Sequence, residues 1–123
     1  MARKVGGCMT SMDESWTLRN GLKIDHRSVL AAMTNKQSHD DGCLSDNEIN
    51  FLKRRAKGGF GIITTAASHV QQSGQGWTGE MGVWSDHHIP GLARLADGIR
   101  EYGSKSFAQL FHGGMRSPSS LTG

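Results

Sequence analysis

Hydrophobic residues along the chain alternate between short unbroken runs and helical spacings. The runs 28–34, 60–65 and 105–111 are apolar over most of their length, as is typical of strands buried in a parallel sheet. Within 46–57 and 89–102, apolar residues recur every three or four positions, which predicts two amphipathic helices. The order strand, helix, strand, helix, strand predicts parallel strands joined by right-handed crossovers.

Turn and cap signals support these bounds. Ser45 and Glu48 form a capping box at the start of the first helix, and Gly58-Gly59 ends it. Upstream, Asn20-Gly21 between alternating residues predicts a hairpin over 16–24, with positive φ at both turn positions. Residues 1–15 show no periodicity and are expected to form a flexible leader.

The lengths of the connecting segments predict which end of the strands carries the functional loops. Each segment that leaves the C-terminal end of a strand is long and polar, whereas each segment that returns from a helix is short. In β/α architectures this pattern places the functional loops at the C-terminal ends of the strands.

One of the long segments contains a possible nucleotide-binding motif. Residues 74–79 read Gly-Gln-Gly-Trp-Thr-Gly, a G-x-G-x-x-G match, but no strand directly precedes them and no helix directly follows. In a chain with 17 glycines among 123 residues, we interpret the match as a coincidence of composition.

Composition and charge narrow the class of protein. The hydrophobic share of 36% and the charged share of 20% suit one soluble globular domain. The basic run 53–57 lies where a helix end favours cations and has no interleaved aromatic residues, so we expect no nucleic-acid partner. No signal peptide or membrane-spanning stretch is evident, and Cys8 and Cys43 suggest reduced thiols; these features predict a cytoplasmic location.

Histidines raise the question of a metal. His87 and His88 are adjacent at the start of the second helix, and His69 follows the second strand. No third ligand has a recognisable spacing, so solvent-facing histidines and no metal are the expectation.

Several spaced motifs together resemble the N-terminal part of a known family. They are Trp16-Thr-Leu-Arg-Asn-Gly-Leu, Arg27 to Thr34, Arg54-Arg-Ala-Lys-Gly-Gly-Phe-Gly61, Gly82-Val-Trp-Ser-Asp86, Ile89-Pro-Gly91 and Gln109-Leu-Phe-His112. From about Trp16 to Arg116 the chain resembles the old yellow enzymes, the FMN-dependent NADH:flavin oxidoreductases. The resemblance implies the first three β/α units of a (β/α)8 TIM barrel after an N-terminal β-hairpin, with the barrel incomplete. It also implies hydride transfer from NAD(P)H through FMN to a small-molecule acceptor such as an α,β-unsaturated carbonyl.

The resemblance assigns cofactor-binding positions near the strand ends. It implies that the backbone at Ala32 and Met33 lies along the flavin and that the Thr34 hydroxyl bonds near its O4 carbonyl. Such a donor favours reduced flavin and raises the reduction potential. The alternative for Thr34 is a hydroxyl that caps its own loop. Ala67 matches a small residue whose backbone approaches the flavin.

The third strand carries two further assignments. A buried amide at Gln109 needs partners for its donors and its acceptor, and the resemblance implies that it meets the flavin pyrimidine. The alternative is a polar layer inside the barrel. Phe111 matches a residue that lines the acceptor pocket, although an aromatic strand residue is often plain core. The loop glycines 74, 76 and 79 would allow an irregular backbone close to neighbouring loops.

Two departures from the family motifs, together with the length of the chain, limit what the resemblance implies. Ala32 replaces a common proline, and His112-Gly-Gly-Met115 lacks the arginine of the family's His-Ala-Gly-Arg, with Arg116 as an imperfect substitute. A closed barrel needs about 250 residues, so we expect the 123-residue chain to be a truncated, split or fragmentary form that is inactive alone, and we assign no catalytic residue. The alternative is a non-catalytic α/β domain that acts as a binding or assembly module, whose partner is a second copy or the missing part of the barrel.

Overall fold

The fold is a small parallel sheet with two helices on one face. The computed structural model describes residues 11–123, so residues 1–10 of the expected leader lie outside the described part. The main elements are β3 (Val29–Leu30), α1 (Asp46–Lys57), β4 (Ile62–His69), β5 (Met81–Gly82), α2 (Ile89–Arg100) and β6 (Lys105–Phe111). Strand β4 is central: β6 pairs along one edge, while β3 and β5 pair with opposite ends of the other, all in parallel.

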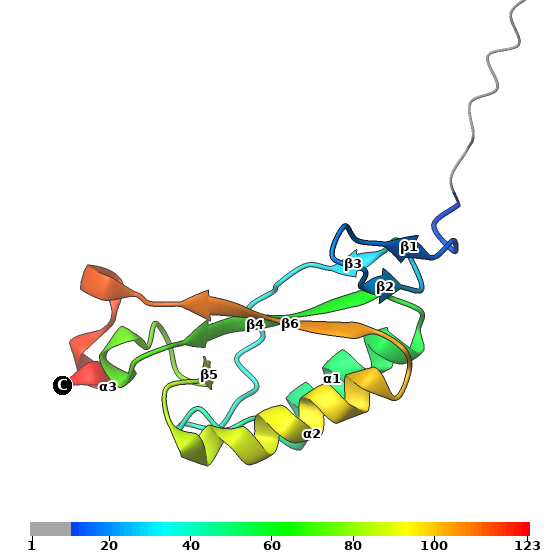
Figure 1. The fold of residues 1–123 in the computed structure, drawn as a ribbon. Helices are drawn as coiled ribbons and strands as arrows, with labels where there is room; N and C mark the ends of the chain where they lie inside the picture. The colour runs from blue at the N-terminus through cyan, green and yellow to red at the C-terminus, as the bar shows by residue number, and fades with distance from the viewer. Residues whose placement is uncertain (1–10) are drawn as a thin grey trace, which may run out of the picture.

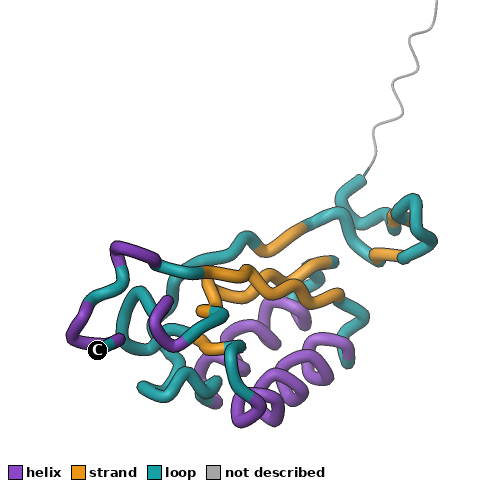
Figure 2. The backbone as a smooth tube through the Cα atoms, turned by 60° about the vertical axis from the view of Figure 1, so that its left-hand side comes forward, coloured by secondary structure: helices purple, strands orange, loops and turns teal. Residues whose placement is uncertain are grey.

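The two helices cover one face of this sheet, as Figures 1 and 2 show. The core lies between the helices and the strands because the apolar stripes of α1 and α2 face the sheet side that carries Leu30 and Ile63. Its buried members are Leu30, Leu44, Ile49, Leu52, Ala56, Ile63, Met81, Leu95 and Ile99. The opposite face of the sheet is open to solvent, and Val29 (55% exposed) and Phe107 (47%) lie on it.

The helix bounds follow the local sequence signals closely. Helix α1 has the expected bounds, and Ser45 Oγ accepts a hydrogen bond from Glu48 N at 3.2 Å. The other half of the predicted capping box does not form, because the Glu48 carboxylate turns toward the loop before the helix. Helix α2 starts at the expected Ile89 and ends at Arg100, two residues early, where a turn to Gly103 (φ 78°) begins.

The first strand of the sheet is much shorter than the predicted 28–34. Only β3 pairs with β4, because β5 occupies the same edge of β4 further along. The segment after Leu30 therefore leaves the sheet, and Ser38 N donates to Gly79 O instead (3.1 Å). The prediction that this strand is buried on both faces was also wrong, since Val29 is exposed and only Leu30 enters the core.

The second strand is longer than predicted. Strand β4 covers 62–69 rather than 60–65, so residues expected in a loop belong to the sheet. Strand β5, which was not predicted, adds two residues beside Ser68 and His69. The third strand, β6, has the predicted bounds.

A hairpin forms in the N-terminal region as expected, with a different turn. Strands β1 (Trp16–Thr17) and β2 (Lys23–Ile24) pair antiparallel. Gly21 has φ 86°, but Asn20 has no positive φ, and Gly21 N donates to Leu18 O at 2.9 Å. The turn is therefore a longer one with a single left-handed glycine, rather than a two-residue turn.

Candidate functional site

A bulge in β4 brings two of the predicted site residues opposite each other. Thr64 pairs with Phe107 and Ala67 with Gln109, so β4 has one more residue than β6 between these pairs. Thr65, at the bulge, accepts the backbone N–H of Gln109 on its Oγ1 at 3.2 Å. In the regular register Ala66 would have faced Gln109; the bulge places Ala67 there.

The Gln109 side chain lies on the open face of the sheet. Gln109, Phe107, Thr64, Ile62 and Val29 line one shallow hollow on this face. The Gln109 amide is exposed and makes no hydrogen bond to any other residue in the described range. It is therefore not the buried amide that sequence reasoning assumed, and both its donors and its acceptor are available to a ligand.

Ala32, Met33 and Thr34 lie in the irregular segment that follows β3. Ala32 is half-buried, whereas Met33 and Thr34 are exposed. The Thr34 hydroxyl makes no hydrogen bond within residues 11–123, so the alternative in which it caps its own loop is not what the structure contains. The ladder that joins Ala67 to Gln109 does not extend to these three residues.

Phe111 ends β6 beside the Gly-Gln-Gly-Trp-Thr-Gly loop. Its ring lies 5.2 Å from that of Trp77, at a tilt of 49°. A pocket at this end of the sheet is lined by Gly76, Trp77, Phe111, His112, Gly113 and Arg116. Arg116, from the 3₁₀ turn Gly114–Arg116, thus supplies a cation at the pocket.

The three glycines of this loop each make room for a different segment. A Cβ on Gly74 would lie 2.5 Å from the His112 ring, one on Gly76 3.0 Å from the Phe111 ring, and one on Gly79 2.7 Å from Lys36 O. Gly79 also has φ 77°. The expected role in close approach of neighbouring loops is confirmed. Gly74 ends a 3₁₀ turn, Gln72–Gly74, rather than a strand, so the strand-turn-helix geometry of a dinucleotide site is absent from this loop.

Glu80 anchors this loop through a hydrogen bond to its backbone. Sequence reasoning did not identify this residue. Its Oε2 accepts the backbone N–H of Gly76 at 2.7 Å, and only 1% of the residue is exposed. Burial raises the pKa of the Glu80 carboxyl, although hydrogen bonds from the backbone of Gly76 and Trp77 work in the opposite direction. The raised pKa favours the neutral acid.

His69 lies beside Glu80, with Nδ1 3.6 Å from Oε2. Trp84 Nε1 donates to His69 Nε2 at 3.0 Å, so Nε2 carries no proton and Nδ1 faces the carboxyl. Burial lowers the pKa of His69, which keeps the imidazole neutral.

Glu48 anchors the segment that follows β3. Asn35 Nδ2 donates to its Oε1 at 3.0 Å, and Ser38 Oγ donates to its Oε2. The residue is fully buried, and both carboxylate oxygens have a donor. Sequence reasoning found Glu48 only as a helix cap.

The expectation of solvent-facing histidines at the helix start is wrong for His88 and right for His87, and His69 is buried too. His69 and His88 are 2% and 3% exposed, and only His87 faces solvent. Burial lowers the pKa of His88, with a further contribution from the neighbouring His87. The fold also brings Cys43 to the histidine pair, so a third potential ligand exists that no sequence spacing revealed.

Parallel strands joined by helices on one face, with long loops at the strand C-terminal ends, are the arrangement of part of a β/α barrel. The chain belongs to the NADH:flavin oxidoreductase / NADH oxidase family, whose model matches residues 16–122. No helix among residues 11–123 has the length and apolar character needed to cross a membrane.

Individual relatives agree with this assignment. Over 108 residues the chain is 35% identical to a probable NADH-dependent flavin oxidoreductase, YqiG, of Bacillus subtilis, covering 88% of this chain and 29% of the relative. A solved 2-naphthoyl-CoA reductase complex is 31% identical with a TM-score of 0.82, over 89% of this chain and 16% of that one. The old yellow enzyme homologue of Zymomonas mobilis shares the fold, with a TM-score of 0.76 at 23% identity over 84% of this chain and 28% of that one. The chain thus spans less than a third of the length of these proteins.

The site residues fit the flavin that the family name implies. A flat heterocycle with donor and acceptor edges requires free polar side chains beside small or apolar ones. The exposed Gln109 amide and Thr34 hydroxyl, which have no hydrogen-bond partner among residues 11–123, meet the first requirement, and the small buried Ala67 opposite Gln109 meets the second.

Proposed function

We propose that this chain forms the first part of an FMN site in an oxidoreductase that uses NAD(P)H. The opposition of Ala67 and Gln109 on β4 and β6 carries the proposal, because it pairs a small residue with a free amide at strand C-terminal ends. The names of the relatives, which include an NADH-dependent flavin oxidoreductase, support the reductant. The acceptor class is an α,β-unsaturated carbonyl or a similar polarised alkene.

In this proposal FMN supplies the chemistry by taking a hydride from NAD(P)H and giving it to the acceptor. The protein residues bind and orient the cofactor. The Gln109 amide donates and accepts along the pyrimidine edge, and the Thr34 hydroxyl donates near O4. The backbone at Ala32 and Met33 and the small Ala67 would hold the ring system. Phe111 and Trp77, whose rings are in contact beside a pocket, would form a wall of the acceptor site.

A chimera tests the proposal. The segment of YqiG aligned with residues 16–122 is replaced by this chain, which restores the length of the relative. We expect a yellow protein with one FMN per chain that oxidises NADH. Gln109→Leu should weaken FMN binding about thirtyfold, since two hydrogen bonds of about 1 kcal/mol each are lost. Gln72→Leu, the same change at an exposed residue, is the matched control. A folded chimera that stays colourless in excess FMN would overturn the proposal.

Thr34 makes a separate prediction in the chimera. A donor near O4 is stronger toward the more negative reduced flavin, so Thr34→Ala should lower the reduction potential and slow reduction by NADH. Thr34→Ser keeps the hydroxyl and should keep the potential. Equilibration with a reference dye measures the potential, and an unchanged value in Thr34→Ala would remove Thr34 from the site.

A second candidate function is that of a non-catalytic assembly module. The exposed apolar side chains Val29, Phe107 and Leu110 (68% exposed) favour it, since such surface is usually covered by a partner. Sedimentation of the 123-residue chain distinguishes the two candidates. A stable colourless monomer with no affinity for FMN favours the module, whereas poor solubility alone together with a yellow chimera favours the enzyme.

A further inference from the structure

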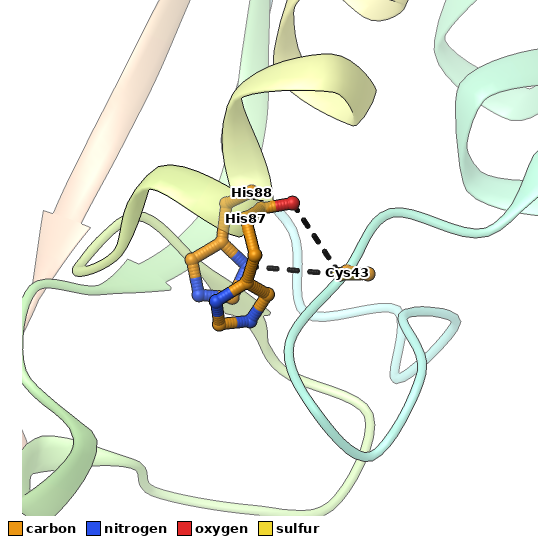
Figure 3. A group of neighbouring side chains, drawn as sticks. All are labelled: Cys43, His87 and His88. Carbon is orange, nitrogen blue, oxygen red and sulfur yellow. Dashed lines mark hydrogen bonds between the residues drawn. The ribbon is translucent and has the colours of Figure 1, made fainter.

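A cysteine and two histidines from two separate segments of the chain meet in the fold. Cys43 belongs to the loop before α1, while His87 and His88 belong to the 3₁₀ turn Asp86–His88 that leads into α2. Each offers one ligand atom, and these three atoms all lie within 4.8 Å of one another. Figure 3 shows the two imidazoles next to each other, with Cys43 beside them; the ring planes are tilted by 43°.

The spacing of these atoms is close to that of ligands on a zinc ion. Cys43 Sγ lies 4.0 Å from His88 Nδ1, and the two imidazole centroids are 3.9 Å apart. With Zn–S near 2.3 Å and Zn–N near 2.0–2.1 Å, tetrahedral ligands would place sulfur and nitrogen about 3.6 Å apart. Small movements of these side chains would therefore bring the sulfur and nitrogen atoms to the distances at which they bind one zinc ion.

The surrounding residues hold the cluster in this arrangement. Asp41 Oδ1 accepts the backbone N–H of Cys43 at 2.9 Å, and Gly82 N donates to Gly42 O at 2.9 Å, which ties the cysteine loop to β5. Ser85 Oγ contacts His87 Nδ1 at 2.9 Å, and Nε2 of His87 has only a longer contact, 3.4 Å to the Asp41 carbonyl oxygen, which a metal on Nε2 would replace. A hydrogen bond to the second ring nitrogen is the usual support for a metal-binding histidine.

His88 is the second observation that points to a ligand. The residue is only 3% exposed, yet its Nε2 has no hydrogen-bond partner among the described residues, and its Nδ1 makes only the long contact to Cys43. Buried imidazoles normally have partners for their nitrogens. A metal on Nδ1, the nitrogen that faces Cys43, would give this buried imidazole a strong partner that the described residues do not supply.

We propose that Cys43 Sγ, His87 and His88 bind one Zn²⁺ ion. Thiolate and imidazole are ligands that zinc prefers, and three protein ligands leave the fourth position to water, since His87 is exposed and Cys43 only half-buried. Binding releases the thiol proton of Cys43 to solvent. The site joins the loop before α1 to the start of α2, two segments whose ligands are 44 and 45 residues apart in sequence.

Cobalt titration tests the site directly. Co²⁺ is added to the tag-free chain, and in parallel to the chimera, on a Cys8→Ser background in which Cys43 is the remaining cysteine of this chain. We expect a cobalt–thiolate charge-transfer band and the visible bands of tetrahedral cobalt, saturating at one ion per chain and abolished by Zn²⁺. Unmodified YqiG serves as the blank for the chimera.

Variants identify the ligands. Cys43→Ser should abolish the charge-transfer band, and His87→Ala should weaken Zn²⁺ binding by at least about tenfold, because even outer partners of ligands contribute 10–100-fold. His26→Ala, remote from the cluster, should bind as the parent does. Zinc should also protect Cys43 from alkylation, measured on the peptide that contains it. Absence of the thiolate band and of this protection, or equal zinc affinity in all variants, would overturn the proposal.

Discussion

Two glutamates with the same degree of burial are held in different ways. Glu48 and Glu80 are 0% and 1% exposed, and each anchors a loop at the C-terminal side of the sheet. Both oxygens of Glu48 accept hydrogen bonds from side chains of the segment after β3. Glu80 accepts from the backbone at Gly76 with Oε2, while its Oε1 has no hydrogen-bond partner among residues 11–123.

The difference teaches that burial alone does not decide how a carboxyl behaves. Donors aimed at both oxygens replace the water that Glu48 loses on folding. Glu80 lacks one donor, so desolvation dominates and raises its pKa. The neighbouring His69 does not reverse the rise in the pKa of Glu80. Burial lowers the pKa of His69 and so disfavours the imidazolium cation that would attract the carboxylate. One loop is thus anchored by a carboxyl group with a donor on each oxygen, and the other by a carboxyl group whose pKa is raised by burial.

The largest effect is expected where the two loops meet. Gly79 has φ 77°, its carbonyl accepts from Ser38 N, and a Cβ would lie 2.7 Å from the Lys36 carbonyl oxygen. Gly79→Ala should therefore lower the free energy of unfolding by about 3 kcal/mol, from backbone strain plus the clash. Urea denaturation of the chain, or of the chimera, measures it.

Gly59→Ala is the matched control for this change. Gly59 has φ 99°, but a Cβ added there would meet no atom within 4 Å, so only the strain applies. We expect Gly59→Ala to lower the free energy of unfolding by about 1 kcal/mol. Equal losses in the two variants would show that the loops do not press on each other at Gly79.

Glu48→Gln should have the next largest effect. Glutamine keeps one oxygen as an acceptor, but its nitrogen faces either Asn35 Nδ2, a second donor, or the buried Ser38 Oγ, which must then accept where it donates in the parent. The expected loss is about 2 kcal/mol in the free energy of unfolding. Glu101→Gln, at an exposed position, should stay within about 0.5 kcal/mol. A Glu48→Gln variant as stable as the parent would mean that these hydrogen bonds add nothing.

Elements set by local signals were predictable from the sequence, and those set by distant contacts were not. The cap at Ser45 fixes the start of α1, and the apolar run of β6 fixes that strand. The shortening of β3 depends on β5 competing for the same edge of β4, which no local pattern records. Strand β5 itself is only two residues long, below what periodicity can detect.

The candidate site shows the same division. Family motifs pointed to Ala67 and Gln109, but their opposition requires a bulge whose extra residue no sequence rule locates. Glu80 and the Cys43 cluster depend on residues that meet only after folding. An acidic residue beside a glycine-rich loop was the one signal that could have drawn attention to Glu80.

The smallest effect, and the sharpest test of the comparison, is the pH dependence of Glu80→Gln. The pKa of Glu80 is raised above its ordinary value of 4.5, so the folded state holds a proton that the unfolded state releases. The parent should therefore lose stability as pH rises from 4.5 through the raised pKa.

Glutamine keeps an acceptor for Gly76 N and cannot ionise. At pH 4 the two proteins should therefore differ by less than about 1 kcal/mol in the free energy of unfolding. As pH rises, the variant should become more stable relative to the parent. His69, whose lowered pKa costs stability below its ordinary value of 6.5, is present in both proteins, so the part of its pH dependence that does not involve its contact with Glu80 cancels in the difference. Urea midpoints between pH 4 and 8 measure the difference, and one that is independent of pH would show that Glu80 is no less well solvated than an exposed glutamate, which would remove the contrast with Glu48.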